Sequence, residues 1–328
     1  MEKEELKQLN DLLEQAYFEI EELYLEDFKI FKTLNDYIIK NFIDINRIIK
    51  YDTRVGLSNS YKYAYDFFNS FNKEYANYLK ENWNDEIINK DFVKFNNSNN
   101  IAETYMENDK AKIYLPFDKT LFDSYSIVHE IIHHMKIEEA NKIGAYNFNI
   151  LCESLSILSE MLFSDYLIKN NVPLNLINKN KVALMRGIQD KSNIFDLDYY
   201  LLERYIYNGN ISNYDISKYL NNSPISICKY FYYTLSEILD RGILSIFFES
   251  RYIIGVFIAS YMHERIQENP KNIDEFIELN DNINKMDILD IFKYLELDVI
   301  NDNNGFIDFS TETYQKLFKS YKKEFSNL

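Results

Sequence analysis

The chain has 328 residues, of which 46% are hydrophobic and 16% aromatic, so it can bury a sizeable core and is too apolar for a disordered protein. Its formal net charge of −16 argues against nucleic acid or an anionic membrane surface as the main partner. Only 7 glycines and 4 prolines are present, which favours long helices joined by Asn- and Asp-rich connections over a many-stranded sheet.

The lack of a signal peptide and the presence of only two, widely separated cysteines favour a cytoplasmic protein. The N-terminal sequence MEKEELKQLNDLLEQ lacks the basic and then apolar segments of a signal peptide. The most apolar stretch, residues 242–262, is interrupted by Glu, Ser and Arg at 249–251, which predicts buried helices rather than a membrane span. Cys152 and Cys228 are far apart, so neither a disulfide framework nor a cysteine metal cluster is expected.

Residues 1–100 are predicted to form an N-terminal helical region. From Glu2 to about Lys94 apolar residues recur every three or four positions, as in LNDLLEQAYFEIEELYLEDFKIF. The loop-like stretch NNSNN at 96–100 marks the boundary with a second region, residues 101–328.

The stretch KAKIYLPF, residues 110–117, predicts a short strand, because apolar residues alternate along it. Pro116 cannot donate a main-chain hydrogen bond, so we expect an edge strand. Asp123 or Ser124 is expected to cap the helix that follows, and helical periodicity returns beyond residue 173.

That next helix contains SIVHEIIHHM, which holds three of the chain's four histidines. His129 and His133 are four residues apart, so both imidazoles can converge on one metal ion, and zinc suits imidazole nitrogen. Glu130 lies about 100° around the helix from His129, where it can reach a water on the metal without binding the metal. His134 lies outside this pattern and is expected to be a surface residue or to support a ligand. The alternative is a solvated helix face with stray histidines.

A catalytic zinc site needs a third protein ligand. The apolar stretch LCESLSILSEMLFSDYL predicts a helix with one polar stripe, formed by Glu153, Ser156, Glu160 and Ser164. Such a stripe is either a solvent face or the wall of a buried polar site. Beside the histidine helix, Glu153 would be the ligand and Glu160 the partner of a histidine N–H, and the reverse assignment stays open.

The segments KIYLPFDKTLFDSYSIVHEIIHHM and ESLSILSEMLFSDYLIKN resemble the core of the M3 zinc metallopeptidases, the family of oligoendopeptidase F and thimet oligopeptidase. That family has an edge strand, a short loop, a His-Glu-x-x-His helix and then a helix with Glu-x-x-Ser. The likeness runs from about Lys110 to the C-terminus and is strongest at these two helices. It implies a mainly α, two-lobed, zincin-like fold with a small edge-strand sheet beside the histidine helix, and makes residues 101–328 the catalytic region.

The resemblance also implies a zinc-dependent endopeptidase that hydrolyses short or unstructured peptides with metal-activated water. Zn²⁺ would be held by His129, His133 and Glu153, and Glu130 would be the general base. A substrate peptide would pair in extended form with the strand at 110–117. Neither the peptide bond that is cut nor the oligomeric state follows from the residues.

The sequence departs from the family in the group that stabilises the oxyanion. Family members are usually longer and use a His and a Tyr for this purpose, whereas no histidine lies between residues 134 and 263 here. Tyr252 is the nearest match for the tyrosine, with Tyr232 and Tyr233 as alternatives. His263 itself is expected to be structural.

The missing oxyanion histidine motivates a second hypothesis. A catalytically inactive relative could bind peptides or a protein partner through the same groove. Retention of Glu130 argues against this alternative, because a binding protein has no use for a general base. A helical interaction protein without any metal is the third possibility.

Overall fold

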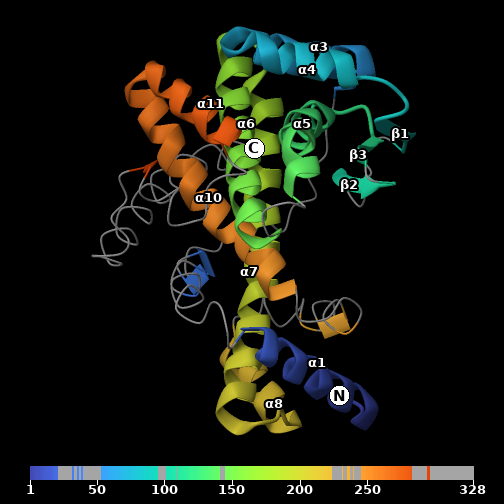
Figure 1. Cartoon of the computed structure of the whole chain (residues 1–328), viewed down its shortest axis with the longest axis vertical. Coiled ribbons are helices and arrows are strands. Elements are labelled where there is room, and N and C mark those ends of the chain that lie inside the picture. The colour runs from blue at the N-terminus through green and yellow to red at the C-terminus, as the bar shows by residue number, and fades with distance from the viewer. Residues whose placement is uncertain are drawn as a thin grey trace. The chain divides into compact units, whose positions relative to one another are not determined.

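Figure 1 shows the computed structural model of the chain, in which helices dominate. The predicted mainly α fold with a small sheet beside the histidine helix is therefore confirmed. None of the helices in the described part has the length and apolar character needed to cross a membrane. The predictions for Tyr232, Tyr233 and the loop at 96–100 lie outside the described residues. The structure describes residues 1–20, 32, 35, 36, 38, 39, 53–94, 101–108, 110–140, 145–223, 231, 235, 236, 239, 245–282, 294 and 295.

The chain packs as two compact units, each built from two separate parts of the sequence. The first unit contains Met1–Asn46 and Arg186–Ile254, and the second contains Arg47–Met185 and Gly255–Leu328. Helices α7 (Leu174–Asn208) and α10 (Ser245–Glu268) each contribute residues to both units. The predicted boundary between residues 100 and 101 falls inside the second unit, and the extent of a catalytic region stays a prediction.

The first unit includes α1 (Lys3–Ile20) and α8 (Asn213–Asn222) together with parts of α7 and α10. The start of α8 is a capping box, in which the Ser212 hydroxyl accepts from the Asp215 N–H and the Asp215 carboxylate accepts from the Ser212 N–H at 2.9 Å. The Asn10 amide of α1 pairs with both main-chain groups of Ile211, at 2.7 and 3.1 Å. Helix α1 is thus tied to the chain just before α8.

The second unit is built around α5 (Phe122–Ala140) and α6 (Ala145–Lys169), which pack against each other. Helix α5 lies between α6 and the sheet, and α3 (Leu57–Phe71) packs on both helices (Figure 1). Helix α4 (Lys73–Asn82) packs on α3, and α11 (Ile273–Asn282) follows a short 3₁₀ turn at Pro270–Asn272. Apolar residues surround most of α5 and α6, which is typical of buried helices. Their fully buried side chains include Val128, Ile131, Ile132, Leu155, Leu158 and Phe163.

The sheet has the strand order β1-β3-β2, with β1 (Ile88–Phe92) parallel and β2 (Glu103–Glu107) antiparallel to β3 (Lys110–Phe117). The predicted edge strand at 110–117 is therefore the central strand. Pro116 is tolerated because β2 pairs only with residues 110–114 and Pro116 lies beyond its end. The prediction of helix up to Lys94 was also wrong at β1, a strand that pairs with residues distant in sequence.

The N-terminus of α5 is capped by Thr120 rather than by Asp123 or Ser124. The Thr120 hydroxyl accepts from the Phe122 N–H at 3.2 Å, and the Asp123 carboxylate accepts from the Thr120 N–H at 3.1 Å. These two side chains thus satisfy main-chain N–H groups at the start of α5. Asp123 accepts a further hydrogen bond, from the Asp118 N–H at 3.1 Å, so its side chain points back along the chain. The start of the histidine helix is thereby fixed to the end of β3.

Candidate metal centre

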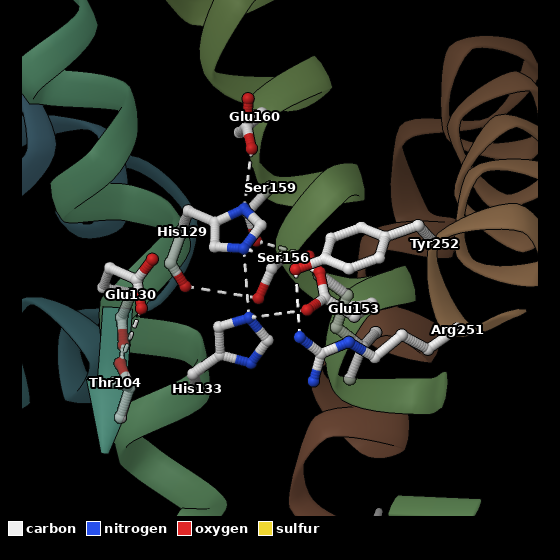
Figure 2. A network of polar contacts seen from close by, with 11 residues as sticks. Thr104, His129, Glu130, His133, Glu153, Ser156, Ser159, Glu160, Arg251 and Tyr252 are labelled. Atoms are coloured by element: carbon white, nitrogen blue, oxygen red, sulfur yellow. Dashed lines mark hydrogen bonds and ion pairs between the residues drawn. The ribbon is translucent and has the colours of Figure 1, made fainter. Parts of the chain in front are cut away.

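The two histidines of the motif lie on successive turns of α5 and point toward α6 (Figure 2). Nε2 of His129 and Nε2 of His133 are 3.0 Å apart, and the ring centres are 4.8 Å apart. The spacing of four residues in a helix accounts for this convergence. The apolar side of α5, which includes Val128 and Ile132, is fully buried.

Glu153 of α6 meets this histidine pair from the opposite helix (Figure 2). Its Oε2 lies 3.6 Å from Nε2 of His129, and its Oε1 lies 3.6 Å from Nε2 of His133. One nitrogen from each histidine and one carboxylate oxygen lie within 4.8 Å of one another. The structure thus brings together the three side chains that the sequence predicts as ligands.

The separations among these three donors suit a zinc ion. Tetrahedral zinc with bonds of about 2.0–2.2 Å separates any two of its ligand atoms by roughly 3.4 Å. The observed separations of 3.0, 3.6 and 3.6 Å lie on either side of that value. Two imidazoles and one carboxylate are also a donor set of catalytic zinc sites, which leaves a fourth position for water. These side chains could therefore hold a metal ion, and their chemistry fits zinc.

Glu160 of α6 supports His129 from the other side of the ring. Its Oε1 lies 2.7 Å from Nδ1 of His129, which assigns the Nδ1 proton to a hydrogen bond with the carboxylate and directs the Nε2 lone pair toward His133 and Glu153. Since Glu160 faces Nδ1 only, the geometry favours Glu153 over Glu160 as the ligand. The Ser156 hydroxyl donates to the main-chain oxygen of His129 at 3.2 Å and joins the two helices at this level.

The electrostatics of the group favour a cation. Burial lowers the pKa of His129, but the hydrogen bond and charge of Glu160, together with the charges of Glu130 and Glu153, outweigh burial and raise the pKa to about 9. The carboxylates of Glu153 and Glu160 lie against the two imidazoles, and all four side chains are largely buried. A positive charge at the point between the imidazoles is therefore stabilised.

Glu130 is buried, and its carboxyl group is held by a strand rather than by the candidate ligands. The Thr104 hydroxyl of β2 donates to Oε2 of Glu130 at 2.7 Å (Figure 2). Burial raises the pKa of Glu130 to about 7; the charge of His129 and the hydrogen bond from Thr104 oppose this rise, and the other two carboxylates reinforce it. A carboxyl group with a pKa near neutrality is suited to accept a proton and return it.

His134 is buried, contrary to the expectation of a surface residue. Its Nδ1 lies 2.8 Å from the Tyr78 hydroxyl of α4, and its Nε2 lies 3.2 Å from the main-chain oxygen of Ala111 in β3. Because a carbonyl oxygen can only accept, Nε2 carries the proton and Nδ1 accepts from Tyr78. His134 thus links α5 to α4 and to the sheet. No pattern in the sequence marks this role, since both partners are distant in the chain.

The fourth histidine, His263, lies in the part of α10 that belongs to the second unit. Its Nε2 is 2.8 Å from Oδ2 of Asp165 in α6, so it joins α10 to α6, as expected for a structural residue. Gly255 lies nearby in sequence and was missed. A Cβ atom at this position would lie 3.3 Å from the main-chain nitrogen of Ser154 and 3.4 Å from Cβ of Glu153. Glycine therefore lets α10 approach α6 closely beside Glu153.

Tyr252, the expected oxyanion donor, lies in the part of α10 that belongs to the first unit, whereas the histidine–glutamate group belongs to the second. Its hydroxyl accepts a hydrogen bond from Arg251 at 3.0 Å. The Arg251 guanidinium and the Lys191 ammonium lie 4.8 and 5.1 Å from its ring centre. The catalytic assignment of Tyr252 stays a prediction.

No family model matches the sequence, and no curated protein matches it. Four solved structures share the fold, and three of them follow. A candidate peptidase from Chlamydophila abortus superposes with a TM-score of 0.56 at 16% identity, covering 98% of this chain and 56% of its own. A candidate oligoendopeptidase F from Bacillus anthracis str. Ames gives 0.58 at 12% identity, covering 94% and 59%. PZ peptidase A in complex with an inhibitor gives 0.55 at 12% identity, covering 97% and 58%.

These likenesses confirm the predicted resemblance at the level of the fold. The chain is folded like oligoendopeptidase F over nearly its whole length. It spans less than three fifths of the length of each of these structures.

Proposed function

We propose that the chain is a zinc-dependent endopeptidase that hydrolyses peptide bonds in short or unstructured peptides. The observation that carries this proposal is the convergence of His129, His133 and Glu153 on one point beside the buried Glu130. The fold, shared with oligoendopeptidase F, supports it. The scarcity of cysteine in the sequence supports a cytoplasmic location.

The three convergent side chains would hold Zn²⁺. A zinc ion bound there supplies a Lewis acid that activates the attacking water and polarises the scissile carbonyl. Glu130 removes the proton from that water and delivers it to the leaving amine nitrogen, so that the carboxyl group is regenerated as a carboxylate. Tyr252 is our candidate for the donor that stabilises the oxyanion.

The substrate strand would pair with β2, and not with β3 as the sequence suggested. The Ile113 N–H donates to Ile87 on the β1 side of β3, so residues 110, 112 and 114 direct their main-chain groups toward β2. The register then turns the N–H and C=O groups of Thr104 and Met106 to the outer edge of β2, which is unpaired with any described strand. An extended peptide can add to such an edge through main-chain hydrogen bonds.

The decisive experiment compares the wild type with Glu130→Gln on a diverse pool of unstructured peptides, with products identified by mass spectrometry. Glutamine keeps the shape of the side chain and removes the base. We expect the wild type to cut and the variant to bind zinc normally without cutting. Zinc binding without cleavage by either protein would instead favour the inactive peptide-binding alternative. Absence of bound zinc would overturn both the peptidase proposal and the inactive alternative. Equal cleavage by the wild type and Glu130→Gln would show that the cleavage does not take place at this site.

A further inference from the structure

A threonine on the sheet contacts the carboxylate that we propose as the general base. The Thr104 hydroxyl lies 2.7 Å from Oε2 of Glu130 and 3.1 Å from the main-chain oxygen of the same glutamate. A hydroxyl carries one proton, and the shorter distance assigns that proton to the carboxylate. Thr104 therefore donates a hydrogen bond to the Glu130 carboxyl group.

The strand that carries this hydroxyl is fixed relative to α5. Thr104 pairs with Ile113 across the β2–β3 ladder, and two residues further Met106 pairs with Ala111. The main-chain oxygen of Ala111 accepts from His134 of α5, one turn after Glu130. The hydroxyl and the carboxylate thus belong to two elements that a second hydrogen bond already holds together.

To act as a general base, the carboxylate of a glutamate must be held in one position, and a fixed hydrogen-bond donor can hold it there. The glutamate side chain has three rotatable bonds, and a buried carboxylate without a fixed donor would be free to adopt several rotamers. Misplacement of a reacting group by about 1 Å can cost a factor of about 100 in rate. A hydrogen bond from a rigid strand removes that freedom before the substrate arrives.

We propose that Thr104 is a positioning residue for Glu130, and that it couples the base to the substrate strand. Its hydroxyl orients the carboxylate, while its own N–H and C=O groups lie at the outer edge of β2, where a peptide can pair. The register of the bound peptide and the position of the base are then set by the same residue. This inference rests on the proposed peptidase function.

Three variants test the hydroxyl. Thr104→Val keeps the shape and removes the hydroxyl, Thr104→Ser restores it, and Tyr105→Phe removes a hydroxyl from the opposite face of the same strand. We expect Thr104→Val to lower kcat by roughly 10- to 100-fold with KM within about threefold of the wild type. Thr104→Ser should recover kcat to within about threefold, and Tyr105→Phe should leave both constants unchanged. Zinc content should stay at one per chain in all three variants.

A second measurement separates this inference from the proposed function. Crystal structures of the metal-free wild type, Thr104→Val and Thr104→Ser proteins report the position of the Glu130 carboxylate directly. We expect the carboxylate to move by more than about 1 Å, or to occupy several rotamers, in the valine variant only. An unmoved carboxylate in Thr104→Val, or a kcat within twofold of the wild type, would overturn the role of Thr104. A wild-type protein that cuts no peptide would overturn the peptidase proposal, while the crystallographic comparison still decides whether Thr104 holds Glu130.

Discussion

Oε1 of Glu160 lies 2.7 Å from Nδ1 of His129, on the side of the imidazole that faces away from Glu153. A carboxylate in this place holds the ring in one tautomer and one orientation and makes its other nitrogen a better ligand. The pair spans two helices, since His129 belongs to α5 and Glu160 to α6. The candidate metal site therefore depends on how these two helices pack.

Replacement of Glu160 by glutamine should weaken zinc binding by about 10- to 100-fold, because the amide keeps the shape but loses the charge that polarises His129. Competition with a chromogenic chelator measures the change. Glu81→Gln, the same substitution at an exposed position of α4, serves as the control and should leave the affinity unaltered. Equal zinc affinities for Glu160→Gln and the wild type would show that Glu160 does not support the ligand.

The neighbouring residues His133 and His134 should respond to alanine substitution in opposite ways. His133→Ala removes a ligand, so we expect protein purified in zinc-containing buffer to carry much less than one zinc per chain. His134→Ala leaves the ligands in place but breaks the links to Tyr78 and Ala111, at a cost of about 2–4 kcal/mol in the free energy of unfolding. Metal analysis and denaturant unfolding in the presence of a chelator give the two readouts. Loss of zinc from correctly folded His134→Ala would contradict the assignment.

Gly255 should be intolerant of even a methyl group. The added Cβ would lie 3.3 Å from the main-chain nitrogen of Ser154, and the backbone of a buried helix yields little. We expect Gly255→Ala to lower the free energy of unfolding by about 1–3 kcal/mol and to weaken zinc binding by displacing Glu153. Unfolding curves and zinc titrations check both effects.

Gly187 offers a matched control for that substitution. It lies at an exposed position within α7, and a Cβ atom there would have no neighbour within 4 Å. Gly187→Ala should therefore be neutral or stabilise the protein by up to about 1 kcal/mol, because alanine favours the helix. If the two alanine variants behaved alike, the close approach of α10 to α6 would not matter for the site.

The candidate metal ligands could be predicted from the sequence because their arrangement is local. His129, Glu130 and His133 depend only on the repeat of one helix, and Glu153 and Glu160 depend on the repeat of the next. An antiparallel pair of helices was the one further assumption needed to bring the two sets together. Its consequence, Glu153 near both Nε2 atoms and Glu160 at Nδ1, is what the structure shows.

The parts that were missed depend on pairing between distant segments. Strand β1 lies in a stretch with helical periodicity and forms because it pairs with β3, so tertiary contacts overrode the local pattern. Strand β2 was not predicted, and Thr104 was missed with it, although the alternation in ETYME could have suggested a strand. The burial of His134 likewise depends on Tyr78 and Ala111, which only the fold brings near.

Two carboxyl groups at the start of α5 predict a pH dependence of stability. Asp123 is buried, and its two oxygens accept the N–H groups of Asp118 and Thr120 at 3.1 Å each. Burial outweighs these hydrogen bonds and raises the pKa of Asp123 to about 8, and the nearby charge of Asp118 acts in the same direction. The folded protein therefore holds a proton on this carboxyl group more tightly than the unfolded chain does.

Since the pKa of an aspartate in an unfolded chain is about 3.9, ionisation of Asp123 opposes folding. Its contribution to stability is most favourable below about pH 4 and is lost progressively as the pH rises toward about 8. The side chain of Asp123→Asn cannot ionise. The free energy of unfolding of this variant minus that of the wild type should therefore rise by more than about 1 kcal/mol between about pH 5 and pH 8. Urea unfolding in the presence of a chelator measures this difference, with the exposed Asp11→Asn as a control that should show none. A difference between Asp123→Asn and the wild type that stays constant with pH would mean that Asp123 is already ionised in the folded protein at pH 5, with its two main-chain hydrogen bonds prevailing over burial.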